Sequence, residues 1–294
     1  MSTRSGFVAL AGRPNVGKST LLNRIVGSKV AIVSNRPQTT RRAIRGIATR
    51  DDSQLVVVDL PGVQRPRDAL TERMQRRMEQ ELEGSDAALL VLAGDQGVGP
   101  GDRFIANAVR GAGLPAVVAV NKIDLLNRAR TVEVLEAAAS LDLDGEIFPV
   151  SARTGAGVGE VVETLVALMP EGPLLYPPEE QTDMSPNVRL AELIREQVLA
   201  RTRDEIPHAV EVEIDEVEER DDGLLVISAR VWAETESQKA ILIGTGGRMV
   251  RAIGTAARRE IEALTGHHVH LDLGVHVRKG WRRDESLLDR LGIE

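Results

Sequence analysis

The chain has 294 residues, a formal net charge of −7, 42% hydrophobic residues and no cysteine. This length predicts about two domains, and the lack of cysteine excludes disulfides and thiolate metal sites and favours a cytoplasmic protein. The acidic total argues against a wholly basic nucleic-acid binder, and no apolar run is long enough for a membrane span or a secretory signal.

The first part of the sequence alternates apolar runs with helix-length segments. The runs are FVALA, LVVVDL, AALLVLA, AVVAVN and EIFPVS. Near-continuous apolar runs of this kind indicate strands that are buried on both faces, so we predict an α/β domain with a mostly parallel sheet and helices on both faces. Ligands of such sheets bind beyond the carboxyl ends of the strands, where the motifs described next lie.

The stretch GRPNVGKST follows the first run and fits the spacing G-x-x-x-x-G-K-[ST]. Its glycines let backbone N–H groups wrap around phosphates at a helix N-terminus. Lys18 would reach the β- and γ-phosphates, and the Ser19 hydroxyl would ligate Mg²⁺. A glycine-rich turn with a solvated lysine is the alternative. The candidate nucleotide-binding residues are Gly12, Asn15, Val16, Gly17, Lys18, Ser19 and Thr20.

The motif NKID follows the run AVVAV and indicates which base is bound. The carboxylate of Asp124 can accept hydrogen bonds from guanine N1–H and the exocyclic amine, a pair that adenine does not supply. Asn121 and Lys122 would brace the base and the loops. Backbone N–H groups at Ser151 and Ala152, after EIFPV, would pack against guanine O6. A polar loop with an exposed aspartate is the alternative.

Two further loops are candidates for the metal and the γ-phosphate. In DLPG, Asp59 would hold Mg²⁺ through water, and the Gly62 N–H would contact the γ-phosphate, so the segment after Gly62 would be a switch. The stretch SNRPQTTRR, residues 34–42, lies where another switch is expected; in chain order it would be the first switch and the segment after Gly62 the second. A threonine hydroxyl in this stretch would complete the Mg²⁺ shell. A plain polar loop is the alternative for this weakly specific stretch.

A break rich in proline and acidic residues, around 169–186, separates two parts of the chain. We predict a nucleotide-binding domain at 1–174, a linker at 175–186 and a second domain at 187–294. The second part predicts a helix near 187–203, strands near 209–219 and 224–234, a short helix near 237–243, a longer helix to about 265 and a strand near 268–278. Helices mixed with a small sheet indicate a compact α+β domain.

The second domain is polarised in charge. Residues 204–222 carry ten acidic residues against the single base Arg220, whereas residues 239–283 carry nine basic residues against three acidic ones. The basic part is therefore the candidate for binding an anion.

The basic part contains a G-x-x-G turn, a loop that can press its backbone against the phosphates of about four nucleotides. The element order around it is that of a type II KH domain. Aliphatic residues such as Ile241, Ile243 and Ile253 could lie under the bases. A protein-binding domain of the same fold is the alternative. The candidate RNA-binding residues are Gly244, Thr245, Gly246, Gly247, Arg248, Arg251, Arg258 and Lys279.

The strand HHVHLDLGVHV places His268, His270, Asp272 and His276 on one face, which permits a metal site. A polar outer face that alternates with core residues explains the same pattern, and we favour that interpretation.

GRPNVGKS, QTTR, DLPG, NKID and SA, in this order, resemble the Era family of translation-factor-related GTPases, and the C-terminal part resembles its KH domain. The resemblance covers nearly the whole chain. It implies GTP and GDP as ligands with Mg²⁺, and a metal shell of Ser19, Thr40 and Asp59. The chain departs from the family at DLPG, where the family's usual motif is DTPG, and this departure should be harmless. It also implies binding to 16S rRNA near its 3′ end and a role in assembly of the 30S subunit.

The resemblance also bears on the rate of hydrolysis. Ras-like enzymes place a water-orienting glutamine directly after the DxxG glycine, but this chain has Val63 there. The family resemblance implies slow hydrolysis unless assisted. In similar GTPases an asparagine at the position of Asn15 helps to bind K⁺ beside the phosphates, and a purely structural asparagine is the alternative. The candidate catalytic residues are Asn15, Lys18, Thr40 and Gly62.

Two other functions compete with an RNA-binding GTPase. A metabolic P-loop kinase or ATPase is disfavoured by NKID. A GTPase whose C-terminal domain binds protein or a membrane surface is compatible with the basic patch. Such a protein would be cytoplasmic and would also associate peripherally with the inner face of the cell membrane. We expect a monomer.

Overall fold

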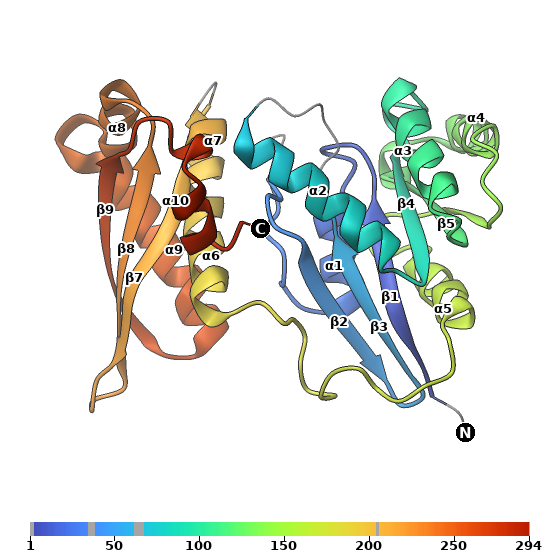
Figure 1. The fold of residues 1–294 in the computed structure, drawn as a ribbon, viewed down its shortest axis with the longest axis horizontal. Coiled ribbons are helices and arrows are strands. Elements are labelled where there is room, and N and C mark those ends of the chain that lie inside the picture. The colour runs from blue at the N-terminus through green and yellow to red at the C-terminus, as the bar shows by residue number, and fades with distance from the viewer. Residues whose placement is uncertain (1–2, 35–38, 62–67, 204–205, 294) are drawn as a thin grey trace. The chain divides into compact units, whose positions relative to one another are not determined.

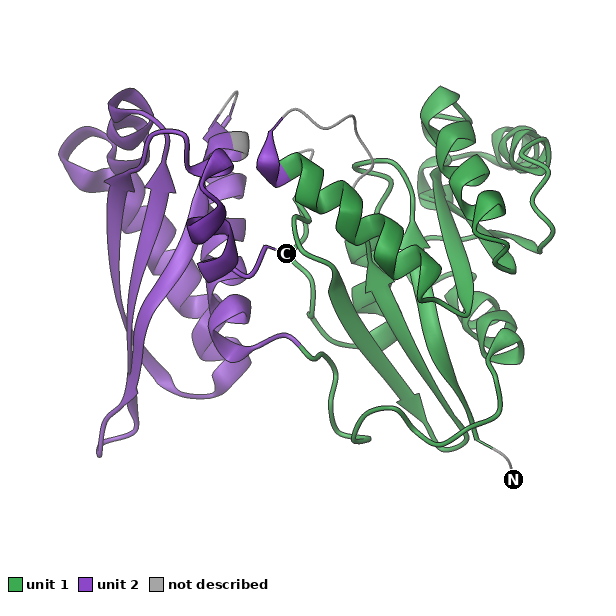
Figure 2. Ribbon diagram, in the orientation of Figure 1, with its two compact units in different colours: residues 1–66, 71–183 green, residues 67–70, 184–294 purple. Residues whose placement is uncertain are grey.

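The computed structural model describes residues 3–34, 39–61, 68–203 and 206–293. The chain forms two compact units (Figure 2). Unit 1 comprises residues 1–66 and 71–183, and unit 2 comprises residues 67–70 and 184–294. The functional division at 174 and 186 stays a prediction.

Unit 1 alternates strands and helices as the apolar runs indicate (Figure 1). Its strands are β1 (Arg4–Ala11), β2 (Ile44–Arg50), β3 (Ser53–Asp59), β4 (Ala87–Ala93), β5 (Ala116–Asn121) and β6 (Ile147–Pro149). Its helices are α1 (Lys18–Val26), α2 (Ala69–Glu83, whose first two residues belong to unit 2), α3 (Pro100–Gly111), α4 (Arg128–Ala139) and α5 (Val158–Leu168), with a 3₁₀ turn at Ile123–Leu125.

The sheet of unit 1 has the order β2-β3-β1-β4-β5-β6. All neighbours pair in parallel except β2, an edge strand that runs antiparallel to β3. The loops after β1, β3, β4, β5 and β6 therefore leave the sheet at the same edge. The sequence motifs occupy four of these five loops.

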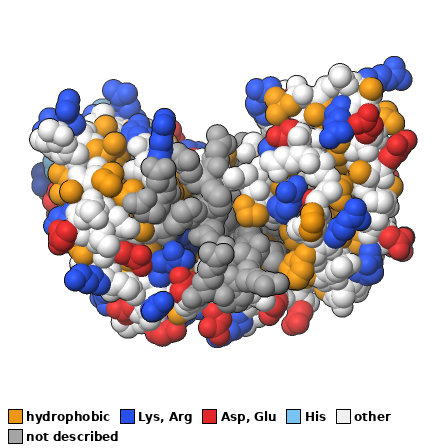
Figure 3. Space-filling view, turned by 90° about the horizontal axis from the view of Figure 1, so that it is seen from above, with side chains coloured by type: hydrophobic (Ala, Val, Ile, Leu, Met, Phe, Trp, Pro, Cys, Tyr) orange, Lys and Arg blue, Asp and Glu red, His pale blue; other side chains and the backbone are white. Residues whose placement is uncertain are grey.

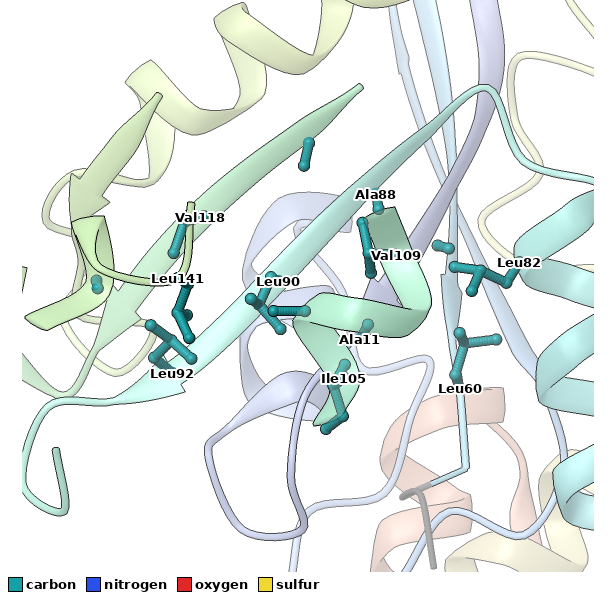
Figure 4. Packing of buried hydrophobic residues seen from close by; sticks show 14 of the residues in the cluster. Ala11, Leu60, Leu82, Ala88, Leu90, Leu92, Ile105, Val109, Val118 and Leu141 are labelled. Atoms are coloured by element: carbon teal, nitrogen blue, oxygen red, sulfur yellow. The ribbon is translucent and has the colours of Figure 1, made fainter. Parts of the chain in front are cut away.

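Helices cover both faces of this sheet. Contacts place α1 and α5 on one face, whereas α2, α3 and α4 contribute to a core on the other. Figure 4 shows part of that core, in which Ala88 of β4 lies beside Val109 of α3, and Val118 of β5 lies beside Leu141. All seven residues of β4 are buried, as a central strand covered on both faces requires.

Residues 170–183, which we call the strap, lie against unit 1 after α5. The buried side chain of Gln54 accepts hydrogen bonds from the N–H groups of Leu175 (2.8 Å) and Tyr176 (2.9 Å) and donates to the Tyr176 carbonyl (3.0 Å). Thr182 forms a β-bridge with Gly46 on the edge strand β2, and the Ile47 N–H donates to the Gln181 carbonyl (2.9 Å). Residues 175–183 of the expected linker thus belong to unit 1, to which they are hydrogen-bonded at both ends of this stretch.

Unit 2 has the expected mixture of helices and a small sheet (Figure 1). Its elements are α6 (Pro186–Arg201), α7 (Ile206–Ala209), β7 (Glu211–Glu219), β8 (Leu224–Ala233), α8 (Glu236–Ile243), a 3₁₀ turn (Thr245–Gly247), α9 (Arg248–Thr265), β9 (His268–Val277), a 3₁₀ turn (Trp281–Arg283) and α10 (Glu285–Arg290). The sheet order is β7-β8-β9, with β8 antiparallel to β7 and parallel to β9.

The core of unit 2 lies between this sheet and helices α6, α8 and α9. The helical stripe of α9 contributes the buried residues Ile253, Ala257 and Ile261, whereas Leu264 at its end is exposed. Helix α10, which the sequence analysis did not predict, is capped by the Asp284 carboxylate, which accepts from the Leu287 N–H (3.1 Å).

Unit 2 also buries a charged side chain. The Arg195 guanidinium of α6 is fully buried and pairs with Glu192 (2.7 Å) and with Glu211 at the start of β7 (3.7 Å). Burial acts to lower the pKa of Arg195, but the surrounding carboxylates raise it overall, so the guanidinium stays charged. The ion pairs join α6 to the sheet.

Candidate nucleotide site and candidate RNA groove

The phosphate loop joins β1 to α1, and its two motif glycines are required by close approaches. A Cβ on Gly12 would lie 2.6 Å from the Val91 carbonyl oxygen. Gly17 has φ 100° and caps α1, and a Cβ there would overlap Nδ2 of Asn121. The loop therefore packs against the ends of β4 and β5, as a loop at this edge of the sheet should.

Lys18 points into this loop. Its side chain is buried, and Nζ donates to the Gly12 carbonyl (3.1 Å). Burial lowers the pKa of Lys18, and the nearby Asp59 carboxylate acts in the opposite direction. An ammonium group held among inward-facing backbone groups matches the role proposed for it at the β- and γ-phosphates.

Three oxygen-bearing side chains meet beside Lys18. Asp59 Oδ2 accepts from Ser19 Oγ (2.6 Å) and Thr40 Oγ1 (3.2 Å), and the two hydroxyl oxygens are 3.4 Å apart. Asp59 is fully buried, and its Oδ1 has no hydrogen-bond partner among the described residues. Hydroxyl and carboxylate oxygens are the ligands that Mg²⁺ prefers, so this set fits the ion that the sequence predicts here.

Burial raises the pKa of the Asp59 carboxyl, and the Lys18 charge and the two hydroxyl donors reduce that shift. A fully buried carboxylate with an unsatisfied oxygen is costly by itself. A divalent cation near this carboxylate would compensate its charge, and a water molecule on that cation could donate to the unsatisfied oxygen.

The base loops are tied to the phosphate loop through Asn121 at the end of β5. Its Nδ2 donates to the Val16 carbonyl (2.9 Å), and its Oδ1 accepts from the Ala152 N–H (2.9 Å). Lys122, in a left-handed conformation with φ 66°, pairs with Asp95 in the loop after β4 (3.2 Å). The bracing roles expected of Asn121 and Lys122 thus have a geometric basis. The Ala152 N–H, expected at guanine O6, here donates to Asn121.

Asp124 follows in the 3₁₀ turn, and both of its carboxylate oxygens have a partner. Ser151 Oγ donates to Oδ1 (2.7 Å), and the Arg153 guanidinium pairs with Oδ2 (2.6 Å). The Ser151 hydroxyl bond and the Arg153 charge lower the pKa of Asp124, which therefore stays an ionised acceptor. Ser151 was expected at the base through its backbone, and the structure adds a contact of its side chain with Asp124.

For the other predicted site residues, the structure gives exposure and backbone conformation, unless they lie outside the described residues. Asn15 is exposed at the top of the phosphate loop with φ 65°, and Thr20 is half-buried in the first turn of α1. Gly62 and Val63 lie outside the described residues, as do residues 35–38 of the expected first switch.

Sequence reasoning missed the side-chain contacts of three arginines around this site: Arg13 with Asp102, Arg24 with the loop after β6, and Arg153 with Asp124. In the phosphate loop, Arg13 Nε donates to the buried Asp102 carboxylate of α3 (2.7 Å). The motif spacing carries no signal for these contacts because their partners lie far away in the sequence.

The G-x-x-G turn of unit 2 forms as predicted between α8 and α9. Gly244, Gly246 and Gly247 all have positive φ (70°, 62° and 75°), which favours glycine at each position. Beside the turn is a groove of about 440 Å³ between α9 and β9. Its lining comprises Gly247, Val250, Arg251, Gly254, Thr255, Arg258, His270, Leu271 and Leu273.

The groove places two of the predicted arginines, Arg251 and Arg258, beside apolar side chains. Arg248 is exposed at the start of α9, and Lys279 is exposed after the end of β9. In the space-filling view, Lys and Arg side chains stand at the surface of unit 2 with hydrophobic side chains between them (Figure 3, left-hand part). The apolar surface comes from Val250, Leu271 and Leu273; Ile253, expected under the bases, is instead a core residue.

Along the histidine-rich edge strand β9, exposed side chains alternate with buried or half-buried ones. His268, His270, Asp272 and His276 are exposed, whereas Val269 is buried and Leu271 half-buried. Within the described residues, no group of three or more His, Cys, Asp or Glu side chains is arranged to hold a metal ion. His270 instead contributes to the groove.

Comparison with known proteins identifies the family. Residues 7–122 match a family described as 50S ribosome-binding GTPase, and residues 205–282 match the KH domain. GTPase Era of Mycobacterium tuberculosis is 48% identical over 296 residues, 98% of each chain. The chain belongs to the Era family of GTPases.

Two solved Era structures have the same fold over both units. Aquifex aeolicus Era bound to GDP and AlF₄⁻ and an Era complex with MgGDPNP and nucleotides 1506–1542 of 16S ribosomal RNA each superpose with a TM-score of 0.95, at 34% identity over 99% of both chains. The predicted fold is thereby confirmed: a P-loop GTPase domain followed by a KH domain. None of the helices in the described part of this Era-family chain has the length and apolar character needed to cross a membrane.

The raised pKa of Asp59 predicts how Mg²⁺ binding depends on pH. A carboxyl with a raised pKa takes up a proton at a higher pH than usual, and the protonated form no longer attracts the cation. The gain in GDP affinity on adding Mg²⁺ should therefore shrink about tenfold per pH unit below that pKa. Titrations with Mg²⁺ and with EDTA from about pH 8 to about pH 5 would measure it.

The EDTA series controls for protonation of the nucleotide phosphates. Asp59→Asn should abolish the gain from Mg²⁺ at every pH. If Mg²⁺ raises the GDP affinity of the unmodified protein by the same factor at every pH tested, Asp59 is not the metal ligand.

Proposed function

We propose that the chain binds GTP and hydrolyses it to GDP and phosphate, and that it binds 16S rRNA through the groove of unit 2 during assembly of the small ribosomal subunit. The observation that carries this proposal is the joint presence of a guanine-type nucleotide site and a basic, partly apolar groove beside a G-x-x-G turn. The Era relative solved with a GTP analogue and an rRNA fragment supports both halves.

Hydrolysis in this site depends on charge compensation. Lys18 and a Mg²⁺ ion held by Ser19, Thr40 and Asp59 would neutralise charge on the phosphates as the bond to the γ-phosphate breaks. With Val63 in place of a water-orienting glutamine, these groups leave hydrolysis slow unless a further cation or a partner assists.

Asn15 is the residue we propose to hold that further cation, K⁺. It is exposed on the phosphate loop, and its left-handed conformation turns the loop backbone there. Asparagine tolerates this conformation better than alanine does, so Asn15→Ala would change both the backbone and the amide oxygen. Asn15→Gly keeps the conformation and removes only the side chain.

Intrinsic GTP hydrolysis should be faster in K⁺ than in Na⁺ at fixed ionic strength, by a factor on the order of ten. Asn15→Gly should hydrolyse GTP at the Na⁺ rate in both salts while retaining its GDP affinity. Single-turnover assays in the two salts measure this. Equal rates in K⁺ and Na⁺ for the unmodified protein would refute the K⁺ proposal and leave Asn15 a purely structural residue.

The groove of unit 2 has the properties of a single-strand RNA site. The glycine turn exposes its backbone, since a Cβ at Gly246 or Gly247 would meet no described atom within 4 Å. Arg251 and Arg258 lie in the lining with Val250 and two leucines, which offers charge for phosphates and apolar surface for bases.

Replacing both Thr245 and Gly246 with Asp should reduce affinity for a 16S 3′-end fragment by on the order of 100-fold, because two carboxylates would face the RNA phosphates. Arg251→Ala and Arg258→Ala should each lower the salt dependence by about one phosphate contact, a slope change of about 0.7. Arg220→Ala, which removes an exposed arginine from the acidic β7–β8 turn, is the matched control and should bind normally.

Competition experiments identify the partner. A 23S fragment of equal length and anionic liposomes should compete poorly with the 16S fragment. Equal binding of the 23S fragment would favour the large subunit, which the description of the GTPase family names. Retention on liposomes with loss of RNA selectivity would favour a peripheral membrane role.

A switch requires the nucleotide site to communicate with the RNA-binding domain, and we propose that Arg45 carries this coupling. Arg45 lies in β2, which follows the expected first switch. Its guanidinium donates to Glu81 of α2 (2.8 Å), the helix after the expected second switch, and to Asp183 at the end of the strap (2.9 Å). Burial acts to lower the pKa of Arg45, but Asp183 and Glu81 raise it overall.

Arg45 thus links three elements, β2, α2 and the strap, whose movement a switch would need. The strap continues covalently into unit 2 at residue 184. A shift of β2 or α2 with the nucleotide state would change the pairing of Arg45 with Asp183. The strap would then be bound to unit 1 more or less strongly.

In the unmodified protein, the GTP analogue and GDP should give different RNA affinities, and RNA should change nucleotide affinity by the same factor. Arg45→Ala should reduce that factor at least threefold while GDP affinity stays within about twofold. Arg50→Ala, an exposed arginine at the other end of β2, is the control and should preserve the factor. Full coupling in Arg45→Ala would eliminate this route, and equal RNA affinities in the unmodified protein would eliminate the switch itself.

A further inference from the structure

The helix that begins at the phosphate loop also holds the base loop, through a residue that no motif includes. Arg24 lies in the last turn of α1. Its Nε donates to the Ala152 carbonyl (3.2 Å), and its Nη2 donates to the Arg153 carbonyl (2.6 Å). One guanidinium thus holds two consecutive carbonyl groups of the loop after β6. The planar fork of arginine suits such a pair of acceptors, whereas a lysine offers a single point charge.

The segment held by Arg24 carries the two side chains that orient Asp124. Ser151 donates to one carboxylate oxygen and Arg153 pairs with the other. Each carboxylate oxygen offers about two acceptor positions, so one on each oxygen remains for the N1–H and the exocyclic amine of guanine. The direction of these remaining positions depends on where Ser151 and Arg153 lie, and therefore on the backbone of the loop.

The opposite side of the same backbone is fixed by Asn121, which accepts from the Ala152 N–H. Arg24 binds the carbonyl side of the segment, and Asn121 binds its amide side. Both also connect the segment to the phosphate site, Asn121 through Val16 and Arg24 through α1 itself. The base loop and the phosphate loop are thereby held as one body.

We propose that Arg24 is a positioning residue for guanine selectivity. By holding residues 152–153 it keeps Ser151 and Arg153 on the Asp124 carboxylate, and so aims that carboxylate at the exocyclic amine of the base. This inference rests on the proposed base site at Asp124. It assigns to α1 a role in base recognition in addition to its role at the phosphates.

The test compares GDP with IDP, which lacks only the exocyclic amine. Arg24→Ala should weaken GDP binding about tenfold and IDP binding by less than about threefold, so the preference for GDP over IDP decreases. Arg24→Lys, which keeps the charge without the fork, should give an intermediate preference. Arg153→Ala should also decrease the preference, because it removes the partner of one carboxylate oxygen.

Two controls separate positioning from folding. Arg103→Ala, which truncates an exposed arginine of α3, should leave both affinities unchanged. The melting temperature of nucleotide-free Arg24→Ala should stay within a few degrees of the unmodified protein, since Arg24 is exposed. Equal weakening of GDP and IDP in both Arg24 variants would overturn the proposal, because a general loss of structure affects both ligands alike.

Asp124→Asn distinguishes failure of this inference from failure of the base site. That variant should lose GDP affinity and gain XDP affinity, because an amide is a better partner for xanthine than for guanine. If Asp124→Asn leaves the GDP to XDP ratio unchanged, the base site itself is misassigned. If that ratio shifts and the Arg24 variants keep the normal GDP to IDP preference, only the role of Arg24 is wrong.

Discussion

The burial of a carboxylate and an ammonium group at the carboxyl edge of the unit 1 sheet constrains the nucleotide-binding domain more than any other feature. Asp59 ends β3 next to Leu10 of β1, and Lys18 begins the helix that follows β1. Each charge would be costly if buried alone. Their proximity, with the hydroxyls of Ser19 and Thr40, requires β1, β3 and the segment before β2 to meet at one place. The strand order meets this requirement by pairing β3 with β1, and the phosphate loop meets it by carrying the chain from the end of β1 to Lys18.

The chemistry of the site could be predicted from the sequence, because short motifs at strand ends encode it. Lys18, Asp59 and Asp124 each follow an apolar run, and the parallel sheet brings the ends of those runs together. The contacts of Arg24 with residues 152–153 and of Arg45 with Asp183 could not be predicted. They join residues more than 100 positions apart in the sequence, and no periodic pattern marks them. Helix α10 was missed for a different reason, since six residues are too few to show a helical pattern.

The two units build their candidate sites in different ways, and the difference follows from what each ligand offers. A nucleotide is small and can be enclosed, so unit 1 collects buried side chains from several loops around it. An RNA strand is long and flexible, so unit 2 offers an open groove beside one glycine turn, with arginines on the exposed side of α9. The polar groups of unit 1 are therefore mostly paired with one another, whereas the arginines of α9 face solvent.

The strap pairs with part of the edge strand β2 of the unit 1 sheet. An edge strand presents unpaired N–H and carbonyl groups that can template the addition of a strand from another chain. Along β2, the backbone of Gly46 and Ile47 pairs with Gln181 and Thr182, and the charged side chains of Arg45 and Arg50 flank this stretch. The segment that leads to the second domain thus occupies backbone groups of β2 that would otherwise be open to a strand from another chain, and it does so with its own backbone.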